Sequence, residues 1–228
     1  KMFDVLKKKD QPPTMDAKMT EDMGRDVPDV VAWTYREVTR SLLGFNAWNH
    51  LIWMTGSGGN GKSKFMAFIS RVFGYMAGTL NNSYWTSHQQ GDTADSSLAL
   101  VVSCRLAFSS ELRVDDKTSF AEERVKQLSG EDKMVLRKLF ENSFVIEPHC
   151  SAWVAMNKIP KFDGTSGGMR RRIRRLVFPW AFGEENKKEP NYSEGVSYNV
   201  DSKLASNDWR DAFMLRLLHT MQTDLVVA

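Results

Sequence analysis

The amino-acid sequence predicts an α/β fold in which helices cover a mostly parallel sheet, and three features indicate it. A short apolar run, residues 51–55, leads into a glycine-rich segment that is followed by a helical pattern. Two later runs of strand length, 105–109 and 151–156, are mostly apolar; the first ends in Ser109 and the second is followed by Asn157. Helical patterns separate these runs. Strands that alternate with helices pair in parallel, because each helix returns the chain to the same end of the sheet.

The composition is that of an ordinary globular domain. The 228 residues suffice for one good-sized domain, and a hydrophobic content of 42% can build its core. A net charge of +3 does not by itself indicate a nucleic-acid binder. No run approaches ~20 apolar residues, so no membrane partner is predicted. The first residue is not Met, and we expect a fragment of a longer protein.

The cysteines and the N-terminus bear on the cellular compartment. Cys104 and Cys150 lie in apolar surroundings and have no zinc-ligand spacing. The N-terminal residues are too charged for a secretory signal. The sequence therefore predicts an intracellular, reducing environment.

Three parts are predicted: a helical lead-in over 1–45, a core over 46–182, and a C-terminal loop and helix over 183–228. Apolar periodicity and glycine or proline breaks set the elements within them. In chain order we predict a helix over 28–42, a strand over 51–55, a helix ending at Phe73, a loop over 79–97 with a short helical entry near 93–95, a strand over 105–109, a helix over 119–129, a helix followed by a β-hairpin within 130–147, strands over 151–156 and 172–178, and a tail helix over 203–224.

The glycine-rich segment fits G-x-x-x-x-G-K-[ST], the Walker A pattern of nucleotide-binding loops. Its residues are Gly56, Ser57, Gly58, Gly59, Asn60, Gly61, Lys62 and Ser63. Glycines let backbone N–H groups approach phosphate oxygens, and the following helix adds its positive N-terminal end. Lys62 can reach the β- and γ-phosphates, and the Ser63 hydroxyl can bind Mg²⁺. The segment predicts a bound nucleotide.

Two polar residues at strand ends are candidates for the chemistry. Glu111 follows the apolar run that starts at Arg105, where an acid that holds Mg²⁺ and activates water belongs. The preceding residue, Ser110, is not a second acid, so Glu111 is expected both to hold Mg²⁺ and to activate water. Asn157 closes the run over 151–156 and can orient an attacking water.

Five arginines fall within residues 170–175. Such a cluster needs an anionic partner or a neighbouring subunit. One arginine can stabilise charge on a neighbour's γ-phosphate in the transition state. The run also fits a nucleic-acid patch or a solvated face, and five arginines cannot all contact one phosphate.

These segments, in this order, resemble superfamily 3 helicases, most closely the C-terminal helicase domain of primase-helicases from large DNA viruses of the poxvirus type, phages and plasmids. That family has a G-x-G-x-N-G-K-S loop, an R-x-x-x-x-S-E strand end, a K-Q-L-T-G-G-D-like segment, an N-x-x-P strand end and R-R-I before an apolar strand. This chain matches at Gly56–Ser63, Arg105–Glu111, Lys126–Asp132, Asn157–Pro160 and Arg171–Ile173. The resemblance spans residues 50–182, and five ordered motifs are far more specific than one.

The resemblance implies a role for each matching residue. Lys62 and Ser63 correspond to the phosphate and Mg²⁺ residues, Glu111 to the catalytic acid that also binds the metal, Asn157 to a sensor of the nucleotide, and Arg172 to the arginine finger. The hairpin segment implies DNA-backbone contacts by Lys133, Arg137, Lys138 and Asn142. Here Arg170 replaces the family's Trp and residues 164–168 replace an acidic stretch. Which arginine of residues 170–175 acts as the finger on a neighbouring subunit's ATP therefore stays open.

The same resemblance implies a P-loop NTPase fold of the AAA+ type, a three-layer sandwich with a channel-lining β-hairpin. It further implies a hexameric ring that binds ATP and Mg²⁺ between subunits and moves single-stranded DNA through its channel. A viral protein of this kind would act in the host cytoplasm or nucleus. Two alternatives remain: another P-loop ATPase, such as a packaging motor or a viral RNA helicase, and an ATP-dependent assembly module with little turnover.

Overall fold

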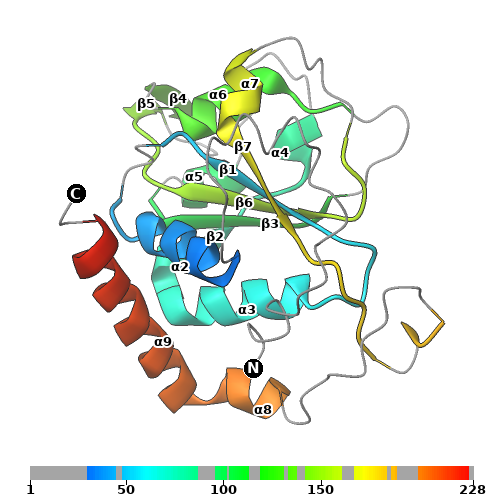
Figure 1. Cartoon of the computed structure of the whole chain (residues 1–228). Helices are drawn as coiled ribbons and strands as arrows, with labels where there is room; N and C mark the ends of the chain where they lie inside the picture. The colour runs from blue at the N-terminus through cyan, green and yellow to red at the C-terminus, as the bar shows by residue number, and fades with distance from the viewer. Residues whose placement is uncertain are drawn as a thin grey trace.

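The protein has helices on both faces of a five-stranded sheet, together with a separate two-stranded hairpin (Figure 1). The computed structural model describes residues 30–44, 48–86, 96–101, 103–112, 119–130, 133–137, 142–160, 167–183, 186–188 and 200–225. Its helices are α2 (Val30–Ser41), α3 (Lys62–Phe73), η2 (Gly74–Met76), α4 (Ser83–Thr86), α5 (Ser96–Val101), α6 (Glu122–Ser129), α7 (Gly167–Arg172), α8 (Val200–Ala205), α9 (Asn207–Thr220) and η4 (Met221–Leu225). No helix within these ranges is both long and apolar enough to span a bilayer.

The strands are β1 (Leu51–Thr55), β2 (Ala77–Thr79), β3 (Leu106–Leu112), β4 (Met134–Arg137), β5 (Ser143–Ile146), β6 (Ser151–Met156) and β7 (Ile173–Val177). The large sheet has the order β2-β3-β6-β1-β7, and every neighbouring pair is parallel. All five carboxyl ends therefore meet at one edge. Because β6 inserts between β1 and β3, three polar strand ends become neighbours at that edge.

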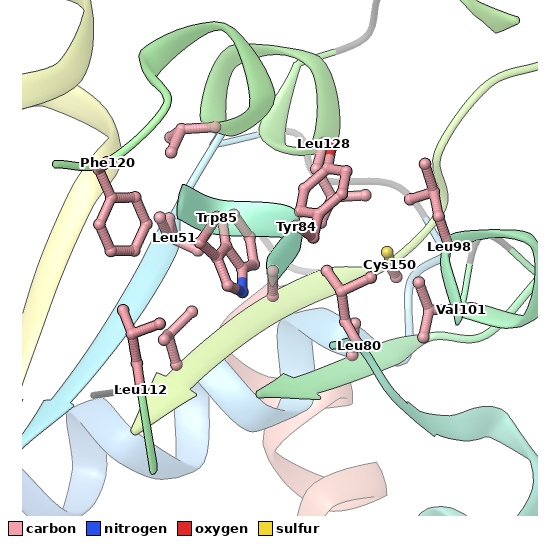
Figure 2. Close-up of a cluster of buried hydrophobic side chains, with 14 of the residues drawn as sticks. Leu51, Leu80, Tyr84, Trp85, Leu98, Val101, Leu112, Phe120, Leu128 and Cys150 are labelled. Carbon is pink, nitrogen blue, oxygen red and sulfur yellow. The ribbon is translucent and has the colours of Figure 1, made fainter. Parts of the chain in front are cut away.

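Side chains from the two faces of the sheet enter two separate cores. In β1, Leu51 and Trp53 face one core, with α4, α5, α6 and α7, whereas Ile52 and Met54 face the other, with α2, α3 and α9. A strand buried on both faces has a continuous apolar sequence rather than an alternating one. Figure 2 shows the first core, where the ring of Trp85 of α4 lies 5.1 Å from that of Tyr84 and 5.7 Å from that of Phe120, between centroids. Each large side chain buried there contributes roughly 1.5–3 kcal/mol. The predicted three-layer α/β fold is confirmed.

Both cysteines are buried and unbridged. Cys150 lies in the first core (Figure 2). Burial raises the pKa of its thiol to about 12, with a smaller contribution from Cys104. The thiols therefore act as small apolar core groups.

The hairpin pairs β4 with β5 in antiparallel register, from Met134 opposite Ile146 to Arg137 opposite Ser143. Its side chains alternate: Met134 and Leu136 are buried in the first core, whereas Val135 is exposed. The hairpin lies beside α6 and α7 and leads into the amino end of β6 (Figure 1). It is therefore far from the edge where the strands end.

Several predicted elements differ from the structure. The helix expected before the hairpin is wrong over 133–137, because burial alternates there with the period of a strand. Strand β2 and helices α4, α5 and α7 were not predicted, and α4 lies within the segment 79–97 that was expected to be a loop. The tail helix is broken at Ser206 into α8 and α9. Residues 1–29 of the lead-in and the helical entry near 93–95 lie outside the described residues.

Candidate nucleotide-binding site

Three predicted site segments meet at the carboxyl edge of the sheet. Gly56 follows β1, Asn157 follows β6, and Glu111 lies near the end of β3. Since β6 pairs with β1 on one side and with β3 on the other, Asn157 is placed between the glycine loop and Glu111. This is the edge where open parallel sheets bind ligands.

The loop has the backbone that its glycines allow. Gly58, Gly59 and Gly61 all have positive φ angles, of 128°, 56° and 84°. A Cβ atom at Gly58 or Gly61 would meet no atom within 4 Å, so these positions need glycine for conformation rather than for space. Turn conformations of this kind can gather backbone N–H groups around a concavity that suits a phosphate.

Lys62, the first residue of α3, is 7% exposed although it carries a charge. Its ammonium group donates hydrogen bonds to the Gly56 carbonyl (2.9 Å), Asn60 Oδ1 (2.8 Å) and Asn157 Oδ1 (3.1 Å). These contacts use all three N–H donors of the ammonium. Burial lowers the pKa of Lys62 to about 8, and the negative charge of Glu111 opposes that shift. Lys62 thus links the loop to β6 and lies within electrostatic reach of Glu111.

Asn60 points into the protein rather than toward the surface of the loop. It is 4% exposed, and its Nδ2 donates to the Phe178 carbonyl at 3.1 Å. Ser57 and Gly59 of the same loop are exposed. Asn60 was predicted as a nucleotide-binding residue. In the structure its side chain is hydrogen-bonded to Lys62 and to the segment after β7.

Glu111 sits on a β-bulge. Between Ser109 and Leu112 the register of β3 shifts by one residue relative to β6. Glu111 has a φ of 53°, a left-handed conformation that costs a non-glycine residue about 1–2 kcal/mol. The bulge leaves both Ser110 and Glu111 exposed at the carboxyl edge, so the carboxylate is available to a ligand there.

Ser63 and Glu111 can supply two oxygen ligands to a magnesium ion. Ser63 is exposed in the first turn of α3, and Glu111 is exposed at the end of β3. Across the described residues, no group of three or more His, Cys, Asp or Glu side chains could hold a metal by itself. One hydroxyl and one carboxylate fit Mg²⁺, which is commonly bound by one or two protein oxygens plus substrate phosphates and water.

Arg172 is not brought together with Lys62. It precedes Ile173, which pairs with Leu51 at the opposite end of β1 from the loop. At about 3.3 Å per strand residue, the separation along β1 is roughly 16 Å. Arg172 is half-buried and donates to the Gly168 carbonyl at 2.9 Å. The arginines of α7 with exposed side chains are Arg170 and Arg171.

The predicted nucleic-acid residues are divided along the hairpin. Lys133 is exposed at its base, where its ammonium lies 3.8 Å from the Glu147 carboxylate. Asn142 is exposed at the end near the turn. Arg137 is the last residue of β4, but its side chain and all of Lys138 lie outside the described residues.

Sequence reasoning missed the residues that support the bulge at Glu111. Asn82 Nδ2 donates to the Ser110 carbonyl at 2.7 Å. Trp85 Nε1 donates to Ser109 Oγ at 2.7 Å, and that hydroxyl donates to the Leu80 carbonyl at 2.8 Å. The only sequence signal was a polar segment, 79–97, that was interpreted as a loop.

Two curated viral proteins are similar to this chain. The helicase-named protein V13 of Sputnik virophage is 28% identical over 169 residues, which cover 72% of this chain and 21% of V13. The helicase-named protein L207/L206 of Acanthamoeba polyphaga mimivirus is 27% identical over 188 residues, which cover 78% of this chain and 19% of that protein. This chain therefore spans about a fifth of the length of each relative.

Solved structures share the fold. Apo structures of the NrS-1 C-terminal region match with TM-scores of 0.52 and 0.53, at 12% and 13% identity. The match covers 79% of this chain and 40% of those chains. A family described as being of unknown function, DUF5906, matches residues 54–174, a stretch that includes the glycine loop, Glu111 and Asn157. Because that match covers more than half of the sequence, this chain belongs to the DUF5906 family.

Proposed function

We propose that this chain is the ATPase domain of a replication helicase of superfamily 3, of the kind found in viral and phage primase-helicases. It hydrolyses ATP and uses the energy to move single-stranded DNA. The observation that carries the proposal is the position of the Lys62 ammonium, which bridges the glycine loop and Asn157 within electrostatic reach of Glu111. The likeness to two helicase-named viral proteins supports it.

The loop binds the phosphates of ATP through its backbone N–H groups and Lys62. The positive φ angles of Gly58, Gly59 and Gly61 support this role, because turn conformations of this kind are typical of backbone anion-binding sites. Lys62 exchanges part of its hydrogen bonding to Asn60, Gly56 and Asn157 for phosphate oxygens. Ser63 and Glu111 would hold Mg²⁺, which would neutralise charge on the phosphates.

Hydrolysis depends on the two strand ends beside the loop. Glu111 accepts the proton of the attacking water, and Asn157 orients that water. The exposure of Glu111 on its bulge supports the first role. The contact of Asn157 with Lys62 supports the second, because it places the amide beside the phosphate-binding group.

The ATP site is completed by a second copy of the chain. Arg172 lies too far from its own loop to reach a phosphate there, so a role for it or for Arg170 or Arg171 requires a neighbour. A closed ring of identical subunits, which we propose to be a hexamer, gives every site such a neighbour. Lys133, Arg137, Lys138 and Asn142 of the hairpin contact the DNA backbone in the channel.

The test is ATP hydrolysis with and without single-stranded DNA, measured together with particle mass by light scattering. We expect an oligomer whose turnover rises with single-stranded DNA. Lys62→Ala should reduce turnover roughly 10²-fold or more, a loss typical of removing a group that stabilises developing charge. The matched control is Lys64→Ala, since Lys64 is exposed on the same helix and pairs only at the surface with Asp201.

Other outcomes point to the alternatives. Stimulation by duplex DNA would indicate a packaging motor, and stimulation by RNA alone an RNA helicase. Assembly driven by ATP, with negligible ATP turnover in the presence of any nucleic acid, would indicate an assembly module. Each of these results contradicts the proposal.

A further inference from the structure

We propose that Asn60 is a positioning residue, which fixes the Lys62 ammonium relative to the carboxyl end of β7. The inference rests on the proposed nucleotide site and adds a residue to its machinery. The general pattern G-x-x-x-x-G-K-[ST] leaves position 60 unspecified, and the pattern G-x-G-x-N-G-K-S has Asn there without stating what its side chain does.

Both ends of the Asn60 amide are engaged. Its Oδ1 accepts from Lys62 at 2.8 Å, and its Nδ2 donates to the Phe178 carbonyl at 3.1 Å. The amide passes close beneath the first residue of the loop: a Cβ atom at Gly56 would lie 1.8 Å from Asn60 Nδ2 and 2.5 Å from the Phe178 carbonyl. Glycine at position 56 therefore leaves room for this bridge.

The anchor at Phe178 is itself fixed. Its N–H donates to the Thr55 carbonyl at 2.8 Å, which extends the pairing of β7 with β1 by one bond. The Phe178 ring is buried and packs against Phe65 of α3, with ring centroids 5.9 Å apart. Asn60 consequently ties Lys62 to a rigid strand end and not to a loose segment.

Of the three groups that hold Lys62, Gly56 and Asn60 belong to the loop, and Asn157 directly follows β6. Asn60 alone also connects Lys62 to β7. Without it, the ammonium keeps its contacts with the Gly56 carbonyl and Asn157, and loses the contact that draws it toward β7. Because Lys62 reaches the β- and γ-phosphates, its displacement should weaken binding of ATP more than binding of ADP.

The experiment compares dissociation constants for ATP and ADP, each with Mg²⁺, by titration calorimetry. Asn60→Ala should weaken ATP binding roughly tenfold or more, as expected for a buried hydrogen bond to a charged group, and ADP binding clearly less. Lys64→Ala changes an exposed residue of α3 outside the loop, whose ammonium pairs with Asp201 at the surface, and should leave both constants within about twofold, as for surface substitutions. Melting temperatures without nucleotide report any structural cost separately. Asn60→Ser serves the same comparison if the alanine variant does not fold.

A double-mutant cycle tests the route through Lys62. In a Lys62→Ala background, Asn60→Ala should cause little further loss, because a residue that acts through Lys62 has nothing left to position. If Asn60→Ala weakens ATP and ADP binding by the same factor, or weakens neither, the ratio of the two dissociation constants is unchanged. That result overturns the inference and leaves the nucleotide site intact. Failure of the wild-type protein to bind either nucleotide overturns the nucleotide site, and the inference with it.

Discussion

Glu111 lies near the end of β3 and Lys62 at the start of α3, and their charges interact. The negative charge of Glu111 raises the pKa of Lys62, against the larger lowering by burial. Glu111 is also held in a left-handed conformation that costs about 1–2 kcal/mol. Strain of this size persists where the surroundings enforce it, here through the bonds of Asn82 and Trp85 to the two residues before Glu111. The bulge leaves Glu111 exposed at the carboxyl edge of the sheet.

Glu111→Gln should separate ATP binding from ATP hydrolysis. The amide keeps the size of the side chain but cannot accept a proton from water, so turnover should fall by roughly 10²–10⁴-fold. The dissociation constant for ATP should change far less. Glu123→Gln, the same chemical change on the exposed side of α6, is the matched control. Unchanged turnover in Glu111→Gln would exclude Glu111 as the base.

The described side chains of the hairpin alternate between the core and the solvent. Met134 and Leu136 anchor it in the core, while the exposed Val135 and Val145 lie opposite one another. At its base Lys133 is partly neutralised by Glu147. Positive charge available to a phosphate backbone is therefore expected nearer the turn, at Arg137 and Lys138.

Changing both of these residues, in Arg137→Ala/Lys138→Ala, should raise the concentration of single-stranded DNA that gives half-maximal stimulation of ATP hydrolysis. Each lost phosphate contact should also reduce the slope of log affinity against log salt by about 0.7. The check is DNA binding over a series of salt concentrations. Lys133→Ala is the comparison and should have a smaller effect. An effect of Lys133→Ala equal to that of the double variant would contradict a contact near the turn.

Some strands could be predicted from the sequence pattern alone, and others could not. The strand over 51–55 and the strand over 151–156 were predicted with their observed bounds, because continuous apolar runs of that length are typical of buried parallel strands. The sequence around 134–137 is equally compatible with a helix, and only its pairing with β5 decides for a strand. Strand β2 has three residues and lies at the sheet's edge, too short to give a periodic signal.

In the candidate site, too, motifs identify some residues, and only the folded structure reveals the others. The glycine loop, Glu111 and Asn157 could be found from motifs because each lies at a recognisable strand end. The orientation of Asn60 could not, since it depends on Phe178, which lies 118 residues later in the chain. The bulge at Glu111 likewise depends on pairing with β6 and on contacts from α4.

At the scale of the whole molecule, the proposed functions occupy opposite edges of one sheet. The glycine loop, Glu111 and Asn157 lie at the carboxyl edge, whereas α7 with its arginines and the hairpin lie toward the other. Strand β7 runs between them, with Arg172 before its first residue and Phe178 after its last. This arrangement suits a ring in which each subunit offers its loop to one neighbour and α7 to the other.

Mixing two inactive variants tests this shared site most directly. One variant carries Lys62→Ala and retains the arginines of α7; the other retains Lys62 and carries Arg170→Ala, Arg171→Ala and Arg172→Ala. We predict that a mixture of the two hydrolyses ATP faster than the sum of the separate samples, because some interfaces combine an intact loop with an intact α7. A mixture that hydrolyses no more than that sum, from variants that fold and assemble, would contradict ATP hydrolysis between subunits.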